Sequence, residues 1–261
     1  MARYKEYGYD IQDGKAIIPE WETEIKEEAF EYCKELTSVE FPLWIKKIGN
    51  SAFNGCENIT EITLPEWVEE IEKSAFSGCK NLKSITLPRW VKKIGDNAFS
   101  LCSSLTSIII PPSVTEIGTR AFWGCSSLTS ITIPPSVTEI KEDIFGGIFS
   151  GCSSLTSITV SKDNKFYDSR EDCNAIIHTE SNTLISGCKN TTIPPSVTEI
   201  GKYAFKDCSS LTSITIPPSV TKIGDWDFSY CSNLTEVRIP KDCHVDNDAF
   251  KYCPHVEIIR Y

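Results

Sequence analysis

The chain is poor in the features that mark many common classes of protein. Its 261 residues include one methionine and three histidines, and 26 basic side chains stand against 36 acidic ones, a net charge of −10. This charge argues against nucleic acid or an anionic membrane as the main partner. No apolar run follows Met1–Lys5, so we expect neither a signal peptide nor membrane insertion. This favours the cytoplasm; a surface or secreted location would need a signal peptide outside this sequence.

Catalytic constellations are also scarce. The glycines mostly follow isoleucine, as in Ile94-Gly95, which indicates turns rather than a phosphate-binding loop. A nucleophile pair could be drawn from Cys173 and His178, with Asp172 as the orienting group. These residues fall in a segment that should form a β-hairpin, where their side chains would point apart or lie exposed. The sequence therefore predicts no enzyme and no cofactor.

Possible metal ligands gather at one place near the C-terminus. They are Cys243, His244, Cys253 and His255. Cys253 belongs to a repeated series of inward cysteines, and Cys243 lies close to an inward position of its own repeat. A zinc site needs ligands that are free to converge, so no metal site is predicted.

What the chain does have is a 23-residue repeat, seen clearly in Leu105 to Ser127. The element F-x-x-C recurs every 23 residues at Phe30/Cys33, Phe53/Cys56, Phe76/Cys79, Phe99/Cys102 and Phe122/Cys125. A fixed period of this length, headed by L-x-x-I-x-I, is typical of leucine-rich repeats.

Each repeat predicts one coil of a solenoid. Leu128, Ile131 and Ile133 alternate with polar residues, which indicates a short strand with one buried face. The pair Pro134-Pro135 ends that strand, because proline has no amide proton to donate to a ladder. A second short extended segment, Val137 to Ile140, follows. The A-F-x-x-C element should then close the coil as one helical or 3₁₀ turn.

The fold class expected is therefore a β-rich α/β solenoid, a curved array of 23-residue coils with short strands and short helical or 3₁₀ corners. We expect about ten stacked coils, each stabilised mainly by its neighbours. Burial of one Phe or Leu contributes roughly 1.5–3 kcal/mol.

The 12 cysteines fit this arrangement. Nine occupy the F-x-x-C position, and Cys188 takes the same position after Ile185. Cysteine is small and readily buried, so we expect a column of buried free thiols rather than disulfides.

The segment Ile110 to Ile131, written I-P-P-S-V-T-E-I-G-x-x-A-F-x-x-C-S-S-L-T-S-I, resembles the BspA-like, or Treponema-type, leucine-rich-repeat family. The resemblance covers nearly the whole chain. It implies a curved solenoid that binds other macromolecules, and some family members are bacterial surface adhesins. It implies no catalytic residue.

We expect one solenoid over residues 1–261, in which five parts can be distinguished. These are an N-terminal cap coil at 1–35, regular coils at 36–160, an irregular hairpin insert at 161–190, regular coils at 191–253 and a C-terminal cap strand at 254–261. Tyr4, Tyr7 and Tyr9 should cover the open N-terminal end of the core, because solenoid ends need capping.

Several coils depart from the repeat. The coil that ends at Cys152 has four extra residues within Lys141 to Phe149, where Gly146-Gly147 indicates a bulge. Trp226 and Asp227 replace the small residues that usually precede the phenylalanine. Arg238 and Arg260 should stack as outward neighbours on the last strands.

The candidate partner-binding residues are four tryptophans spaced by 23, where later coils have serine: Trp21, Trp44, Trp67 and Trp90. Val68 and Val91 should point inward, so Trp67 and Trp90 should point outward. The charges beside the column alternate from coil to coil, as in Lys46-Lys47 and Glu69-Glu70. The column is either a structural ladder or an exposed aromatic patch for a partner.

The leading prediction is a non-enzymatic protein-binding scaffold in the cytoplasm, monomeric or a weak homodimer. It would bind an unidentified protein through the tryptophan-bearing coils. One alternative is a bacterial surface adhesin for host or neighbouring-cell proteins. Another is an inhibitor or adaptor of a dedicated enzyme in a bacterial or phage conflict system.

Overall fold

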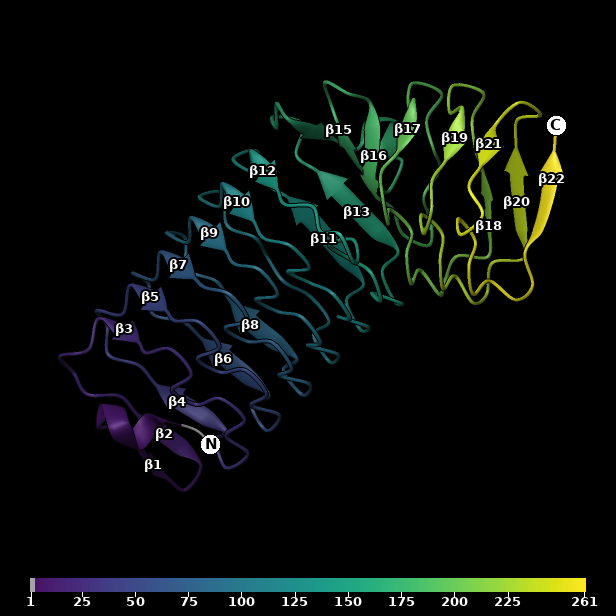
Figure 1. Cartoon of the computed structure of the whole chain (residues 1–261). Coiled ribbons are helices and arrows are strands. Elements are labelled where there is room, and N and C mark those ends of the chain that lie inside the picture. The colour runs from purple at the N-terminus through teal and green to yellow at the C-terminus, as the bar shows by residue number, and fades with distance from the viewer. Residues whose placement is uncertain (1–2) are drawn as a thin grey trace.

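The computed structural model describes residues 3–261 and shows a curved row of stacked coils (Figure 1). The solenoid has about 11 coils of roughly 23 residues, slightly more than the ten expected. A complete coil contributes a first strand, a turn, a second strand and a corner, whereas the coils that contain Ile108 and Ile193 have only the second strand. The two strands lie on opposite sides of one core.

The second strands form the most regular part of the solenoid. Six of them make a continuous parallel sheet in the order β12-β10-β9-β7-β5-β3. In this sheet Glu70 pairs with Lys93, and Ile71 pairs with Ile94, so residues 23 apart are direct neighbours. The members are β3 (Glu24–Ile25), β5 (Lys47–Ile48), β7 (Glu70–Ile71), β9 (Lys93–Ile94), β10 (Glu116–Ile117) and β12 (Glu139–Ile140). Their counterparts toward the C-terminus are β17 (Glu199–Ile200), β19 (Lys222–Ile223) and β21 (His244–Val245).

The first strands form shorter parallel sheets, β6-β8, β11-β13 and β18-β20-β22. In them polar residues face out and isoleucine or valine faces the core, as the alternation predicted, except in the last strand, where Ile258 is 42% exposed. The strands are β4 (Ser38–Glu40), β6 (Glu61–Thr63), β8 (Ser84–Thr86), β11 (Ser130–Ile133), β13 (Ser157–Val160), β18 (Ser213–Thr215), β20 (Glu236–Ile239) and β22 (Glu257–Arg260).

A column of phenylalanines runs through the core. Consecutive rings from Phe30 to Phe149 stack with centroids 5.3–5.9 Å apart. Phe205, Phe228 and Phe250 continue the stacking beyond the insert. Each ring covers the next, so one coil buries the apolar face of its neighbour.

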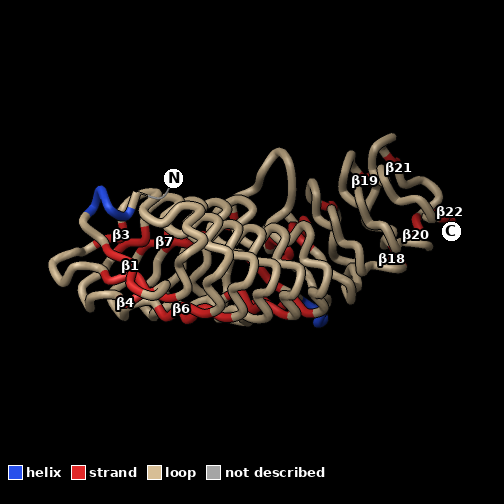
Figure 2. Tube along the Cα trace, turned by 90° about the horizontal axis from the view of Figure 1, so that it is seen from below, coloured by secondary structure: helices blue, strands red, loops and turns tan. Residues whose placement is uncertain are grey.

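The helical corners expected from the sequence are wrong, and with them the α/β description. Two short 3₁₀ segments, η1 (Tyr4–Tyr7) and η2 (Arg170–Asp172), are the only helical elements in residues 3–261 (Figure 2). In a regular corner Ser74 and Gly78 both have positive φ, 57° and 71°. Left-handed residues at both ends leave too few residues between them for a helical turn.

The corner amides are instead shared between coils. Ser74, Phe76 and Gly78 donate to carbonyls of the following coil at 2.7–2.8 Å, while the amides between them bond within the corner. The corner is therefore a third line of inter-coil hydrogen bonding beside the two strands. This satisfies backbone groups that a helix would have paired internally.

The column of buried free thiols is confirmed. All 12 cysteines are free and buried. In seven of them the thiol donates to the carbonyl of the phenylalanine in the preceding coil at 3.0–3.1 Å, as Cys79 does to Phe53. Cys188 is buried too, but its thiol lies 3.3 Å from the Asn174 carbonyl, because the insert replaces the regular corner there.

The N-terminal end is covered as expected. Tyr4 and Tyr9 are buried, and each ring lies 5.8 Å from the ring of Phe30, so they extend the aromatic column outward. Tyr7 stands beside Tyr9 at 5.9 Å. The strands β1 (Asp10–Gln12) and β2 (Lys15–Ile17) form an antiparallel pair. β2 also pairs in parallel with β4, which makes a three-stranded sheet at this end.

The two strands expected in the insert are present as the antiparallel pair β15 (Ile176–His178) and β16 (Thr183–Ser186), with β14 (Tyr167–Asp168) beside them. β16 pairs in parallel with β17, so the hairpin is built into the stack. The row of coils changes direction at this point (Figure 1).

The expected stacking of Arg238 on Arg260 is wrong. β20 and β22 pair with Ile239 opposite Arg260, one residue away from the expected register. The Arg260 guanidinium instead donates to the carbonyls of Lys241 and Cys243 at 2.7 and 3.0 Å.

Candidate functional site

The four tryptophans lie in the turn between the first and second strands, on one edge of the solenoid. Their exposed fractions fall along the column, from 80% at Trp21 and 60% at Trp44 to 46% at Trp67 and 43% at Trp90. Val68 is fully buried, as expected, so the preceding side chain points out. Sequence reasoning missed Leu43, which is 69% exposed next to Trp44 and continues the same apolar surface. We call this surface the tryptophan face: Trp21, Leu43, Trp44, Trp67 and Trp90.

The structure brings two members of the face into direct contact. The rings of Trp67 and Trp90 are 6.2 Å apart and parallel within 8°. The guanidinium of Arg89 lies 5.6 Å from the Trp90 ring centroid and favours this ring position electrostatically. Trp21 and Trp44 share the edge with greater exposure, so part of the face is a stacked pair and part is more accessible.

Ion pairs between coils flank the stacked pair on both sides. Arg89 pairs with Glu66, and Lys92 pairs with Glu69 at 2.5 Å. The hydrogen bond from Lys92 lowers the pKa of the exposed Glu69 carboxyl. The alternation of charge predicted along the sheet is thus confirmed. Exposed pairs of this kind contribute little to stability, but they satisfy each other's charge and leave the aromatic rings as the distinctive feature of the edge.

In the later coils, serine at the tryptophan position forms a hydrogen bond to the preceding coil. The hydroxyls of Ser113, Ser136 and Ser219 donate to the carbonyl of the inward valine one coil earlier, at 2.6–2.7 Å. A hydroxyl at this position ties neighbouring coils together, and an indole cannot reproduce that bond. The N-terminal coils therefore exchange an inter-coil bond for an exposed aromatic side chain.

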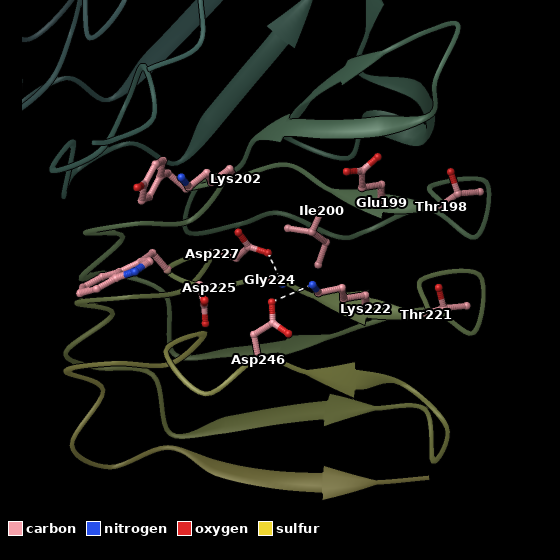
Figure 3. A pocket seen from close by; sticks show the side chains of 12 residues that line it. Thr198, Glu199, Ile200, Lys202, Thr221, Lys222, Gly224, Asp225, Asp227 and Asp246 are labelled. Atoms are coloured by element: carbon pink, nitrogen blue, oxygen red, sulfur yellow. Dashed lines mark hydrogen bonds and ion pairs between the residues drawn. The ribbon is translucent and has the colours of Figure 1, made fainter. Parts of the chain in front are cut away.

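A second feature is a groove of about 680 Å³ between β17 and β19 (Figure 3). The Asp227 carboxyl lies in its floor, 1% exposed, and accepts a 2.7 Å hydrogen bond from the Gly224 amide. Burial raises the pKa of Asp227 to about 7. Lys222 pairs with Asp246 of the next coil at 2.8 Å on the β19 side of the groove. The other lining residues include Thr198, Glu199, Ile200, Lys202, Tyr203, Thr221, Asp225 and Trp226.

The residues considered for nucleophilic chemistry are not assembled. Cys173 is 1% exposed, and burial raises the pKa of its thiol to about 11. The Nδ1 atom of His178 lies 2.9 Å from the Ser181 hydroxyl. The thiol is thus held protonated in the core while the imidazole bonds elsewhere.

The C-terminal residues considered for zinc are also engaged separately. His244 Nε2 lies 2.9 Å from a carboxylate oxygen of Asp246, and the Cys253 thiol donates to Phe228 in the buried column. Within residues 3–261 no three His, Cys, Asp or Glu side chains gather closely enough to hold a metal ion. Among those residues, too, no helix has the length and apolarity needed to span a bilayer.

The coil geometry, the period and the inward Leu, Ile, Phe and Cys positions define the class of protein as leucine-rich-repeat solenoids. A profile of the BspA type leucine rich repeat region matches residues 23–148 and 185–261. The chain belongs to this family, as the resemblance of its repeats indicated. None of the curated proteins matches it.

Several solved bacterial structures are similar. A leucine rich cell surface protein from Faecalibacterium prausnitzii is 25% identical with a TM-score of 0.57, over 97% of this chain and 92% of that protein. A leucine-rich repeat protein from Bacteroides ovatus is 29% identical with a TM-score of 0.65, and the match covers 93% of this chain and 59% of that one. A third, from Eubacterium ventriosum, is 23% identical with a TM-score of 0.65 over 95% and 80% of the two chains, and shows the fold alone.

These comparisons give no support to the cytoplasmic location expected from the sequence. The Faecalibacterium relative is described as a cell surface protein.

Proposed function

We propose that the protein is a non-enzymatic scaffold, displayed on the cell surface or secreted, that binds a protein partner through the tryptophan face. One observation carries the proposal: Trp67 and Trp90 form a stacked, exposed pair between two inter-coil ion pairs, at a position where serine in the later coils donates a hydrogen bond to the preceding coil.

The chemistry of the face suits a protein partner. Tryptophan is enriched among residues that dominate binding energies, since it presents a large area with few rotatable bonds. Trp67 and Trp90 are already held in place, so binding would order few additional torsions. The acidic and basic side chains beside them form a polar rim of the kind that surrounds interface centres.

A location outside the cytoplasm is supported by the cell surface relative and is compatible with the free thiols. Free cysteines are unusual in oxidising compartments. Here burial raises the pKa of the Cys79 and Cys125 thiols to about 12, which keeps the reactive thiolate scarce. Oxidation would require the core to open first.

The test compares three forms of the chain immobilised on beads: the native sequence, the triple variant Trp44→Ser, Trp67→Ser, Trp90→Ser, and the control Ile109→Ser. Ile109 is 83% exposed but lies outside the tryptophan face. Serine is chosen because it matches the later coils, where its hydroxyl binds the preceding coil. Each form is incubated with surface and secreted proteins of the source cells and of cells grown with them, and retained proteins are quantified by mass spectrometry.

We expect one protein to be retained by the native chain and by Ile109→Ser, and to be reduced at least roughly tenfold with the triple variant. Equal retention on all three forms would remove the tryptophan face from the proposal. Proteolysis of intact cells tests the location separately. Cleavage of the chain without lysis is expected, whereas full protection would favour the cytoplasmic adaptor or inhibitor.

A further inference from the structure

The joint between β17 and β19 lacks the hydrogen bonding that joins the other second strands. In regular coils the glycine after the second strand donates to the isoleucine carbonyl one coil earlier, as Gly95 does to Ile71 at 2.8 Å. The Gly224 amide donates to the Asp227 carboxylate instead, at 2.7 Å. β17 belongs to the sheet of β16, and β19 to the sheet of β21. The ladder is thus interrupted where no residue is inserted.

Packing around the glycines gives independent support for an open joint. A Cβ atom added to Gly95 would lie 2.5 Å from the Glu72 backbone of the preceding coil, and one added to Gly49 would lie 2.6 Å from the Ile25 carbonyl oxygen. At Gly224 the three nearest atoms all belong to the Asp227 carboxyl, at 3.2–3.7 Å. The preceding coil lies farther away here than at Gly95 or Gly49, and the groove of about 680 Å³ occupies the space (Figure 3).

The cause is a single residue type. Asp227 occupies the position that Ala75, Ala98, Ala121 and Ala204 fill in other coils. Its carboxylate accepts the amide of Gly224, which in a regular coil would bind the preceding coil, as the Gly95 amide does. One carboxylate thereby takes a donor from the strand ladder.

We propose that Asp227 is a proton-sensitive switch that sets how far the joint between β17 and β19 is open. An ionised carboxylate is a stronger acceptor than a backbone carbonyl and retains the Gly224 amide, which holds the joint open. A protonated carboxyl is a weaker acceptor, so the Gly224 amide returns to the Ile200 carbonyl and the joint closes. The two C-terminal coils then change their angle to the rest of the solenoid.

The surrounding charges place this change near neutral pH. Burial raises the pKa of Asp227 to about 7, and the negative charges of Asp246 and Glu199 add to the effect. Asp225 is exposed on the same wall of the groove. Of the facing cations, Lys222 is paired with Asp246, and Lys202 lies over the Tyr203 ring at 4.9 Å, so neither is paired with Asp227.

The test is amide hydrogen exchange resolved by residue, at pH 5.5 and pH 8.5, expressed as protection relative to the unstructured chain. It uses the full chain and the variants Asp227→Asn and Asp227→Ala. In the native chain we expect protection of the Thr221 amide, which would rejoin the ladder of the preceding coil when the joint closes, to be greater at pH 5.5 by roughly tenfold, the factor for one unit of proton affinity. Gly95 serves as a control that should not change.

Asp227→Asn cannot ionise and should show no pH dependence at Thr221. Asp227→Ala restores the residue of the regular coils and should give high protection at both pH values. Equal protection of Thr221 at both pH values in the native chain would overturn the proposal. So would the same pH dependence in Asp227→Asn, which remains informative if the alanine variant does not fold.

Discussion

The thiol of Cys102 donates a 3.1 Å hydrogen bond to the carbonyl of Phe76 in the preceding coil. Both residues are fully buried. The cysteine column is therefore more than a series of small apolar residues: at seven positions the thiol is a second donor to a phenylalanine carbonyl, as at Phe76, which also accepts the Cys79 amide at 3.3 Å. A methyl group would fill part of the same space but would leave that carbonyl without this donor.

Cys102→Ala should lower the free energy of unfolding by roughly 1–3 kcal/mol, through the lost hydrogen bond and the small cavity. Cys102→Ser keeps a donor and should cost less. The midpoints of urea unfolding, with the slope unchanged, measure both effects. A serine variant less stable than the alanine variant would show that burying the hydroxyl outweighs the retained bond.

The thiols should react very slowly in the folded protein. Burial raises the pKa of Cys79 and Cys125 to about 12 and that of Cys173 to about 11, so at pH 8 these groups are almost entirely protonated as well as covered. Treatment with an alkylating reagent, followed by mass spectrometry, should modify few of the 12 cysteines before unfolding and all of them afterwards. Rapid modification of the column in buffer would mean that the coils open locally.

The glycine after the second strand should be required for the stability of a regular coil. Gly95→Ala would place a methyl group 2.5 Å from the Glu72 backbone, so the two coils would have to separate. We expect a loss of roughly 1–3 kcal/mol, measured by thermal unfolding. Gly146→Ala is the control, since its nearest neighbour would be 3.7 Å away. Equal effects of the two changes would contradict close inter-coil packing at Gly95.

Asp227 should make stability depend on pH. Its pKa is raised from 3.8 to about 7 in the folded protein, so the folded state binds this proton more tightly than the unfolded chain. The protonated Asp227 therefore adds to the free energy of unfolding below about pH 4, and this contribution is lost as pH rises toward 7. Asp227→Ala should be more stable than the native chain at pH 8, by roughly 1–4 kcal/mol, with a much smaller difference at pH 4. An advantage that does not vary with pH would exclude a titrating carboxyl.

Much of the solenoid could be predicted because the repeat carries its own register. Residues 23 apart become neighbours, so the buried Phe and Cys columns, the outward tryptophans and the alternation of Lys47, Glu70 and Lys93 all followed from spacing. The tryptophan face was predicted as a column but not as a stacked pair. Only Trp67 and Trp90 stack within it, and the ion pairs formed by Glu66 and Glu69 lie beside these two rings.

The corners could not be predicted correctly because their local pattern fits a helical turn. Glycine at positions 55, 78, 124 and 151 was a signal of left-handed backbone. Serine and asparagine at the other left-handed position, such as Ser74 and Asn97, give a weaker one. Inter-coil hydrogen bonds make that conformation favourable, and they exist only once coils are stacked.

The sequence by itself determined the repeat class, the period and which side chains face the core, because residues 23 apart take the same position in successive coils. Tertiary structure alone decided how the insert joins the stack, which tryptophans touch and where the ladder opens. Those outcomes depend on competition between hydrogen-bond partners from different coils. At Gly224 the choice between the Asp227 carboxylate and the Ile200 carbonyl is made by geometry that no single repeat contains.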